Sequence, residues 1–246
     1  VNHAEIAGPG FINFYMNHVA LTTVIKDILY HGDKYGRVPP KPEHKVTVEF
    51  VSANPTGPLH VGHGRGAAYG ASLASILGAA GYKVQTEYYV NDHGRQMDIL
   101  AVSVWLRYLE LCGENVRFPD NGYRGDYIYN IAREVRSEIG DRWRFRGQDV
   151  VDGLPPDESQ GGDREIHIDA LIDRAREFLG GDGYLAFFET SVDSILMDIQ
   201  KDLSEFGVNF DHWFSEKELE DSGALDHAIQ RLEENGHLYK KDGATW

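Results

Sequence analysis

The sequence has 246 residues, of which 41% are hydrophobic and 26% charged, and its formal net charge is −15 at pH 7. This composition is typical of globular proteins and excludes disorder as the default state, and the charge by itself argues against a nucleic-acid partner. No apolar stretch approaches the ~18–20 residues that a membrane span needs, the start Val1-Asn2-His3-Ala4 has no signal-peptide pattern, and the single Cys112 allows no internal disulfide, so we expect a cytoplasmic protein without membrane contact.

The first elements end at a proline-rich linker. Residues 11–17 have the aromatic content of a strand, and residues 18–30 carry apolar side chains at helical spacing. The run Pro39-Pro40-Lys41-Pro42 then predicts a stiff linker, because proline fixes φ and donates no backbone hydrogen bond. We therefore expect a domain boundary after residue 40.

An alternating α/β pattern follows this linker. The sequence predicts strands and helices in the order strand, helix, strand, helix at Lys45–Val51, Val61–Ala80, Lys83–Val90 and Gln96–Leu111. That order implies a right-handed crossover and a parallel sheet. Since such sheets bind ligands at the carboxyl ends of their strands, the loops at 52–63 and 91–96 are the expected ligand-binding segments.

Beyond Asp120 the pattern becomes helical, with helices expected at 126–139, 166–179, 184–206 and 222–235. Residues 1–120 hold 10 basic and 11 acidic side chains, whereas residues 121–246 hold 14 and 28. The excess negative charge therefore belongs to the helical part and not to the segment with the ligand-binding loops. We expect residues 121–232 to form a helical insertion or lobe, and residues 233–246 to return to the preceding domain.

Two histidines begin the first helix of the α/β pattern. His60 and His63 are three positions apart, so both imidazoles lie on one side of the helix, beside free N–H groups and a partial positive charge. Gly62 between them lets a phosphate or a flat base approach the backbone. Zinc binding by the two histidines is a competing interpretation, as is plain helix capping. With no Glu between them and no Cys nearby, we predict no protein-bound metal.

These residues also resemble a known family, the class I aminoacyl-tRNA synthetases, and most closely the bacterial arginyl-tRNA synthetases. The matching signature consists of Ala53, Asn54, Pro55, Thr56, Gly57, Pro58, Leu59, His60, Val61, Gly62 and His63. Further segments are similar to the same family in the same order, namely Gly8–Phe14, Tyr88–Gln96, Phe210–Glu216, Gly236–Tyr239 and Asp242–Trp246. The resemblance therefore covers nearly the whole chain.

The resemblance implies an α/β fold: a Rossmann-like class I synthetase catalytic domain with a parallel sheet, plus a mainly helical insertion. Residues 1–40 would end an N-terminal tRNA-contacting domain, and residues 41–120 would form the first half of the catalytic domain. Family members continue past the last matched segment into more of the sheet and an anticodon-binding domain. The resemblance thus implies a fragment that lacks these parts and is inactive by itself.

The implied activity is that of an arginine–tRNA ligase, whose partners are L-arginine, tRNA(Arg) and ATP as a substrate that carries Mg²⁺. The parent protein is expected to be monomeric. His60 and His63 would be the catalytic residues, one of them as an imidazolium, and ATP would also contact Pro58, Leu59 and Gly62. Arginine would contact Glu49, Ser52 and Asn54, and further substrate or nucleotide contacts are expected at Asn91, Asp92 and Gln96. For Asn91 and Asp92, turn formation and helix capping are equally good interpretations.

The sequence departs from part of the family at Gly57. Some members carry a lysine there, and in those a later Lys-Met-Ser-Lys-Ser loop is degenerate. With Gly57 the charge against the leaving pyrophosphate must come from elsewhere, most simply from an intact loop of that kind, which these 246 residues do not contain.

Three other functions compete with this interpretation. Another class I synthetase is the nearest, and the loop at 52–58 argues against it. A non-catalytic tRNA-binding paralogue is a second, against which the retained His60, His63 and Glu49 speak. A plain soluble α/β domain with a helical lobe is the third, and it leaves the constrained loop before His60 unexplained.

Overall fold

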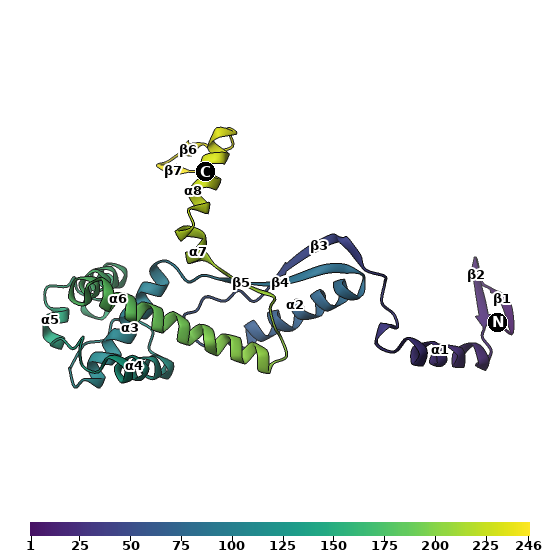
Figure 1. Cartoon of the computed structure of the whole chain (residues 1–246), viewed down its shortest axis with the longest axis horizontal. Coiled ribbons are helices and arrows are strands. Elements are labelled where there is room, and N and C mark those ends of the chain that lie inside the picture. Colours follow the sequence, from purple (N-terminus) through teal and green to yellow (C-terminus); the bar gives the residue numbers. More distant parts are fainter. The chain divides into compact units, whose positions relative to one another are not determined.

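The computed structural model describes the backbone of residues 1–246 and every side chain except that of Leu21. The chain divides into two units, one made of Val1–Val46 and Leu73–Val84, the other of Thr47–Ser72 and Gln85–Trp246 (Figure 1). Strands β3 and β4 and helix α2 have residues in both units. The predicted site residues all lie in the second unit.

The first unit begins with an antiparallel hairpin of β1 (His3–Ala7) and β2 (Phe11–Tyr15). Helix α1 (His18–His31) follows, and the Asn17 side chain caps it by accepting from the Ala20 N–H at 2.8 Å. A short 3₁₀ turn, η1 (Gly32–Lys34), then ends the helix. The strand and helix predicted at 11–17 and 18–30 are thus confirmed, whereas β1 was not predicted.

A three-stranded sheet in the order β3-β4-β5 carries the α/β pattern. Its strands are β3 (Lys41–Glu49), β4 (Tyr82–Val90) and β5 (His212–Ser215), and α2 (Val61–Ala79) connects the first two. β5 pairs in parallel with β4, from Glu87 opposite His212 to Val90 opposite Ser215. The predicted parallel α/β fold is confirmed, but β5 lies in a region expected to be helical.

Both ends of the predicted strand differ in the structure. Lys41 and Pro42, expected in the proline-rich linker, belong to β3, and Phe50 and Val51, expected in the strand, follow its end at Glu49. Pro42 is tolerated because β3 is an edge strand with one partner, so a missing N–H costs no central hydrogen bond. Val51 leaves the strand because its φ is +68°.

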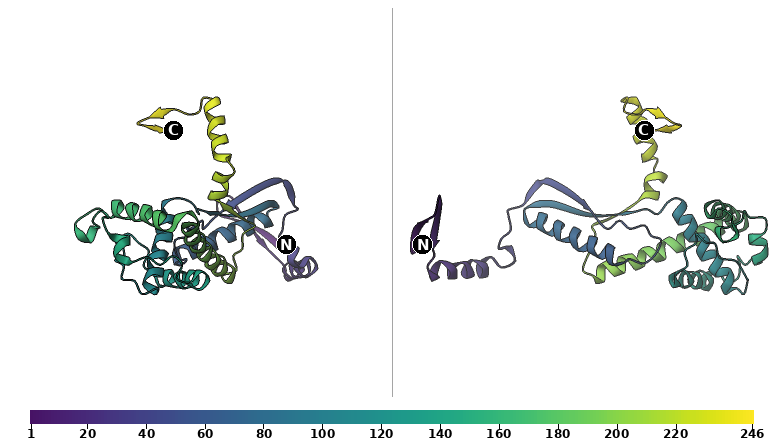
Figure 2. Two further views of the ribbon diagram at one scale, coloured as in Figure 1. Left: turned by 60° about the vertical axis from the view of Figure 1, so that its left-hand side comes forward. Right: turned by 180° about the vertical axis from the view of Figure 1, so that it is seen from behind.

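Helices inserted between β4 and β5 form the main hydrophobic core. α3 (Arg95–Leu111) packs against α4 (Asp126–Ile139) and α6 (Arg164–Glu205), and these three helices lie side by side in Figures 1 and 2. Trp105, Tyr108 and Phe187 are fully buried among them. The shorter α5 (Gly147–Val151) and the 3₁₀ turn η2 (Glu158–Gln160) complete this helical part.

Helix α6 runs through both helices predicted at 166–179 and 184–206. At Gly180 the backbone is not helical, with φ +63° and ψ −176°, so two helical segments meet at a kink there, and the predicted break between the two helices is confirmed. After β5 come α7 (Glu216–Asp221), α8 (Ala224–Glu234) and a hairpin of β6 (Lys240–Lys241) and β7 (Ala244–Thr245). The single helix predicted at 222–235 corresponds to α8, and α7 was not predicted.

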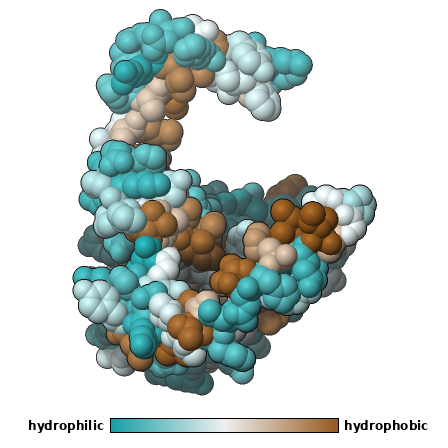
Figure 3. Space-filling model, turned by 90° about the vertical axis from the view of Figure 1, so that its right-hand side faces the viewer, coloured by the Kyte–Doolittle hydropathy of each residue, from teal (hydrophilic) through white to brown (hydrophobic). Residues whose placement is uncertain are grey.

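Apolar side chains are exposed on several elements, and Figure 3 shows brown apolar atoms open to solvent on one face. On α2 they include Val61, Tyr69 and Ile76, which are 92%, 73% and 65% exposed. Among the described helices, none is both long and apolar enough to cross a membrane. The buried residues of α2 are Ala67 and Gly70, so most of this helix is at least partly open to solvent.

Two glycines on α2 give a prediction about stability. A Cβ at Gly70 would overlap the ring of Phe50, whereas a Cβ at Gly66 would meet nothing within 4 Å. We expect Gly70→Ala to destabilise the chain by about 1–3 kcal/mol through overpacking, and Gly66→Ala on the same helix to stabilise it by about 0.5–1 kcal/mol. Urea unfolding of the two variants measures both. Equal stabilities would contradict the close packing of α2 on Phe50.

Candidate functional site

A tight turn leads from β3 into the loop that precedes the two histidines. Val51 and Ser52 have φ values of +68° and +41°, a region that residues with a Cβ rarely adopt and that is most costly for β-branched valine. The Ser52 N–H donates to the Phe50 carbonyl at 3.0 Å, and the Ser52 Oγ accepts from the Tyr89 N–H at 3.1 Å. The loop is therefore anchored to β4 where it begins.

Tyrosine hydroxyls hold the loop farther along. Tyr88, fully buried on β4, donates to the Ala53 carbonyl at 2.9 Å, and Tyr127 donates to the Thr56 carbonyl at 2.7 Å. A Cβ added at Gly57 would lie 3.0 Å from the Tyr127 Oη. Position 57, where some members of the resembled family carry lysine, thus has no room for a side chain while Tyr127 keeps its place.

The two histidines lie against each other at the start of α2. Their ring centroids are 3.7 Å apart and their planes differ by 16°. The Gly62 N–H donates to the His60 Nδ1 at 3.1 Å, and the His60 N–H donates to the His63 Nδ1 at 3.3 Å. A Cβ at Gly62 would lie 2.9 Å from the His60 ring, so this stacked arrangement requires glycine there.

These hydrogen bonds decide which ring nitrogens carry protons. Since each Nδ1 accepts from a backbone N–H, the proton of a neutral ring lies on Nε2, which is left as a donor. Burial, and to a smaller extent the neighbouring His60, lower the pKa of His63, which favours its neutral form. Helix capping, one of the competing interpretations, is therefore present. It leaves both Nε2–H groups as donors to an anion.

The predicted arginine contacts and the candidate Gln96 are partly brought together. Asn54 donates from its side-chain amide to the Gln96 Oε1 at 2.7 Å, although 42 residues separate them. Glu49 is an exposed residue at the end of β3, and its charge is one of the causes that raise the pKa of Tyr89. Asn54, Gln96 and Glu49 thus lie at the carboxyl ends of β3 and β4, as parallel-sheet topology predicts.

Asp92 and Asn91 instead hold the sheet to the helix that follows β5. Asp92 accepts from the Ser215 Oγ at 2.6 Å and from the Lys217 N–H at 2.9 Å. Asn91, with its amide oriented as the network requires, donates to the Glu216 Oε2 at 2.7 Å. The structural interpretation of these two residues is therefore the one that the contacts favour.

Sequence reasoning missed Tyr89 and Glu216 at this edge of the sheet. Burial raises the pKa of Tyr89, and so do the carboxylates of Glu216, Asp92 and Glu49. These carboxylates come from three different segments and make the surroundings negative. Tyr89 could have been found from its position in the predicted strand, but nothing in the sequence near Glu216 indicates that it reaches β4.

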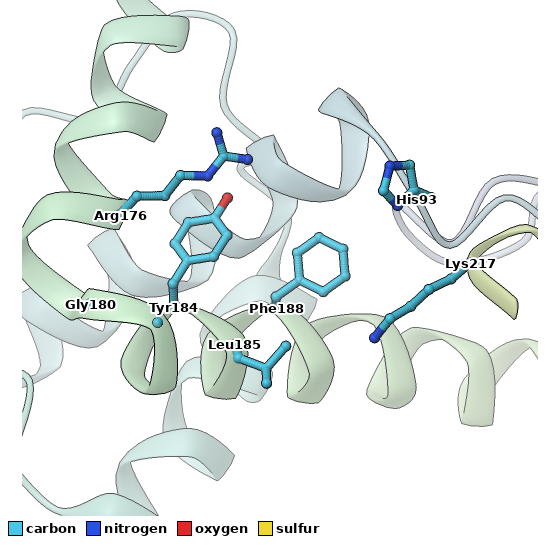
Figure 4. A pocket seen from close by; sticks show the side chains of 8 residues that line it. His93, Arg176, Gly180, Tyr184, Leu185, Phe188 and Lys217 are labelled. Atoms are coloured by element: carbon cyan, nitrogen blue, oxygen red, sulfur yellow. The ribbon is translucent and has the colours of Figure 1, made fainter. Parts of the chain in front are cut away.

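A cavity of about 580 Å³ lies elsewhere in the molecule. Figure 4 shows Tyr184, Leu185 and Phe188 projecting into it from α6, with His93 and Lys217 on the opposite side. None of the predicted site residues lines it. Its cationic groups already have acidic partners, in the pairs Arg176–Asp98 at 2.8 Å, Lys217–Glu189 at 3.4 Å and His93–Glu220 at 3.0 Å. The cavity therefore offers no unpaired charge to a ligand.

The competing interpretation, a metal ion bound by the two histidines, requires further ligands nearby. Among the described side chains, no group of three or more His, Cys, Asp or Glu residues is placed to hold a metal ion. The stacked rings of His60 and His63 direct their Nδ1 atoms to the backbone. A zinc ion held by both histidines would need further ligands from outside this arrangement.

Comparison with known families gives one match to a family model. Residues 24–113 match the family described as tRNA synthetases class I (R), catalytic domain. The matched range contains the loop, both histidines and Gln96, and it ends just after α3.

Similar curated proteins cover the whole chain. The arginine–tRNA ligase of Thioalkalivibrio sulfidiphilus is 57% identical over 246 residues, and that of Legionella pneumophila strain Corby is 54% identical over 246 residues. In both cases the alignment covers 100% of this chain and 42% of the relative. The chain thus spans less than half the length of these relatives.

Solved structures agree with the fold. A Campylobacter jejuni structure assigned as an arginyl-tRNA synthetase has a TM-score of 0.69 at 29% identity and covers 94% of this chain and 43% of that one. The arginyl-tRNA synthetase of Thermus thermophilus, with a TM-score of 0.54 at 22% identity, covers 98% of this chain and 34% of that one. The second likeness concerns the fold alone.

Proposed function

Because the chain belongs to the arginyl-tRNA synthetase family, we propose that it carries the site that activates L-arginine with ATP and then transfers the arginyl group to tRNA(Arg). In the first step a carboxylate oxygen of arginine attacks the α-phosphorus of ATP. The bond from that phosphorus to the bridging oxygen breaks, and pyrophosphate leaves. Such an in-line displacement depends on positioning and on neutralising charge.

The pair of Nε2–H donors on His60 and His63 is the observation that carries the proposal. Both rings are fixed by backbone hydrogen bonds at the N-terminus of a 19-residue helix, where the helix dipole favours an anion. We assign them to the phosphates of ATP, with His63 as a neutral donor. Gly62, Pro58 and Leu59 complete the ATP-binding segment of the signature from Ala53 to His63. Mg²⁺ enters with the nucleotide.

Carboxylates at the neighbouring strand end favour a cationic amino acid. Glu49, Asp92 and Glu216 all raise the pKa of Tyr89, so the surroundings of this tyrosine are negatively charged. A guanidinium is the side-chain cation that pairs best with carboxylates, through bidentate hydrogen bonds. We assign Glu49 to the guanidinium of arginine, and Ser52, Asn54 and Gln96 to the polar groups around it. Asn91 and Asp92 hold this edge in place through their hydrogen bonds to residues 215–217.

Several finer points belong to the same proposal. We place residues 1–40 in an N-terminal tRNA-contacting domain, residues 41–120 and 233–246 in the catalytic domain, and residues 121–232 in the helical insertion. We also propose that the enzyme is monomeric and cytoplasmic. The single free Cys112 fits a reducing compartment.

An exchange assay tests the function and its alternatives. In the gene product that contains this chain, exchange of labelled pyrophosphate into ATP, with tRNA present, should depend on arginine and on none of the other amino acids. Exchange that depends on a different amino acid would indicate another class I synthetase. Binding of tRNA with no exchange for any amino acid would indicate the non-catalytic paralogue.

The 246-residue chain alone gives a second prediction. It spans 42% of the length of its relatives and has none of the Lys-Met-Ser-Lys-Ser sequence that would neutralise the leaving pyrophosphate. We expect no arginine-dependent exchange above background from the purified chain, under conditions in which the gene product is active. Clear exchange by the chain would overturn the expectation that further residues are needed.

A further inference from the structure

Tyr127 connects the helical part to the loop that ends in His60. It lies in the first turn of α4, and its hydroxyl donates to the Thr56 carbonyl at 2.7 Å, across 71 residues of sequence. Burial raises the pKa of Tyr127 to about 12, so the hydroxyl remains a donor throughout the neutral range. Thr56 is four residues before His60, and the loop between them contains Pro58, whose φ is fixed.

Two glycines make room for the tyrosine ring. A Cβ at Gly57 would lie 3.0 Å from the Tyr127 Oη and 3.1 Å from its Cζ, and a Cβ at Gly125 would overlap Cε1 and Cδ1 of the same ring. The ring thus fills the space that the missing side chains leave at both glycines, one in the loop and one just before α4. Close packing of this kind transmits small displacements, because neither neighbour can move without the other.

The helix that carries Tyr127 is itself held firmly. Ile128, Ile131 and Ala132 of α4 are buried, and α4 packs against α3 and α6. The loop, by contrast, has strained backbone at Val51 and Ser52 and an exposed His60. The hydrogen bond from Tyr127 therefore joins the packed helix α4 to the loop that begins with this strained backbone. A small shift of the loop at Thr56 would move the histidines.

We propose that Tyr127 is a positioning residue that sets where His60 and His63 stand, through the Thr56 carbonyl and the side-chain-free position of Gly57. This inference rests on the proposed function, since the histidines are its point of action. The helical part thereby acts in adenylate formation indirectly: it holds the loop that positions the two histidines.

Tyr127→Phe tests the proposal, and Tyr129→Phe is its matched control. Tyr129 lies on the same helix, but its hydroxyl donates to the Glu110 Oε2 at 2.7 Å and not to the loop. In the gene product that contains this chain, Tyr127→Phe should lower kcat for arginine-dependent exchange about 3- to 10-fold, the scale of one hydrogen bond, with little change in KM for arginine. Tyr129→Phe should stay within about twofold of the unsubstituted protein.

A second measurement does not depend on activity. Hydrogen exchange of the amides from Ala53 to His60 should be faster in Tyr127→Phe and unchanged in Tyr129→Phe. Gly57→Ala should disturb the loop in the same way, and less so when combined with Tyr127→Phe, which removes the 3.0 Å contact with the hydroxyl and leaves the ring free to turn from the 3.1 Å contact with Cζ. The double substitution is therefore expected to be less harmful than the two single effects combined.

Equal behaviour of Tyr127→Phe and Tyr129→Phe in loop exchange would overturn the proposal, as would simple additivity of Gly57→Ala and Tyr127→Phe. If the unsubstituted gene product shows no arginine-dependent exchange, the proposed function fails. Hydrogen exchange of the loop then still decides whether Tyr127 positions it.

Discussion

Replacing His60 or His63 by alanine in the gene product that contains this chain is expected to lower the rate of arginyl-adenylate formation by about 10²-fold or more. Each substitution removes an Nε2–H donor that we assign to the phosphates of ATP, and the loss of one donor at developing negative charge typically has this effect. Each also removes one ring of a stacked pair whose centroids are 3.7 Å apart. Single-turnover measurements of adenylate formation give the rate directly.

His227→Ala is the control for these variants. His227 is an exposed histidine on α8, and we expect its replacement to change the rate by less than about twofold. Since His60 and His63 also bond to the backbone at the start of α2, circular dichroism must show that the variants keep their helices. Folded His60→Ala and His63→Ala proteins with rates near that of the unsubstituted protein would remove both residues from the reaction.

Replacing Glu49 by glutamine is expected to raise KM for arginine about 10- to 100-fold, with a smaller change in KM for ATP. The substitution keeps the size of the side chain but removes the charge that we assign to the guanidinium, and a hydrogen bond to a charged group contributes about 1.5–3 kcal/mol. Exchange assays over a range of arginine concentrations measure the effect.

Glu43→Gln makes the same change on the same strand. Glu43 is exposed in β3, and its carboxylate lies 3.6 Å from the His44 Nε2, so we expect normal kinetics. If Glu49→Gln and Glu43→Gln raised KM for arginine equally, the selectivity would have to be assigned to other carboxylates of this edge, beginning with Glu216.

Elements with strong local signals were predictable from sequence. The helix expected at 126–139 has those bounds in the structure, because Gly125 and Gly140 flank a regular apolar stripe and Gly140 adopts a φ of +62°. The strand expected at 83–90 is β4 with one additional residue. Such elements are determined by periodicity and by the residues at their ends, both of which are visible in the sequence.

Strand β5 was missed because its pairing is long-range. It has four residues, and its partner β4 lies about 120 residues earlier in the chain, so neither length nor local pattern distinguishes it. Helix α7 was missed although it begins with a local signal: the Ser215 side chain caps it by accepting from the Glu218 N–H at 3.1 Å, and Asp92 accepts from the Lys217 N–H as well. Short elements of this kind form through tertiary contacts and have little propensity of their own.

For the candidate site, the sequence indicated which residues belong together but not which side chains they contact. The motif predicted that His60, His63 and Gly62 act together, and the requirement for glycine at position 62 follows from the stacked rings. The motif did not indicate that Tyr127 occupies the space beside Gly57, because their contact joins the loop to a helix 71 residues beyond Thr56. Nor did it indicate that Asp92 is bonded through both of its oxygens.

A crystal structure of the gene product with a non-hydrolysable arginyl-adenylate analogue, an arginyl sulfamoyl adenosine, would show the positions of both substrates. We expect the group that replaces the phosphate to lie within hydrogen-bond distance of the Nε2 atoms of His60 and His63, and the guanidinium to lie at Glu49. An analogue bound in the cavity lined by Tyr184 and Phe188, with both histidines untouched, would contradict this expectation.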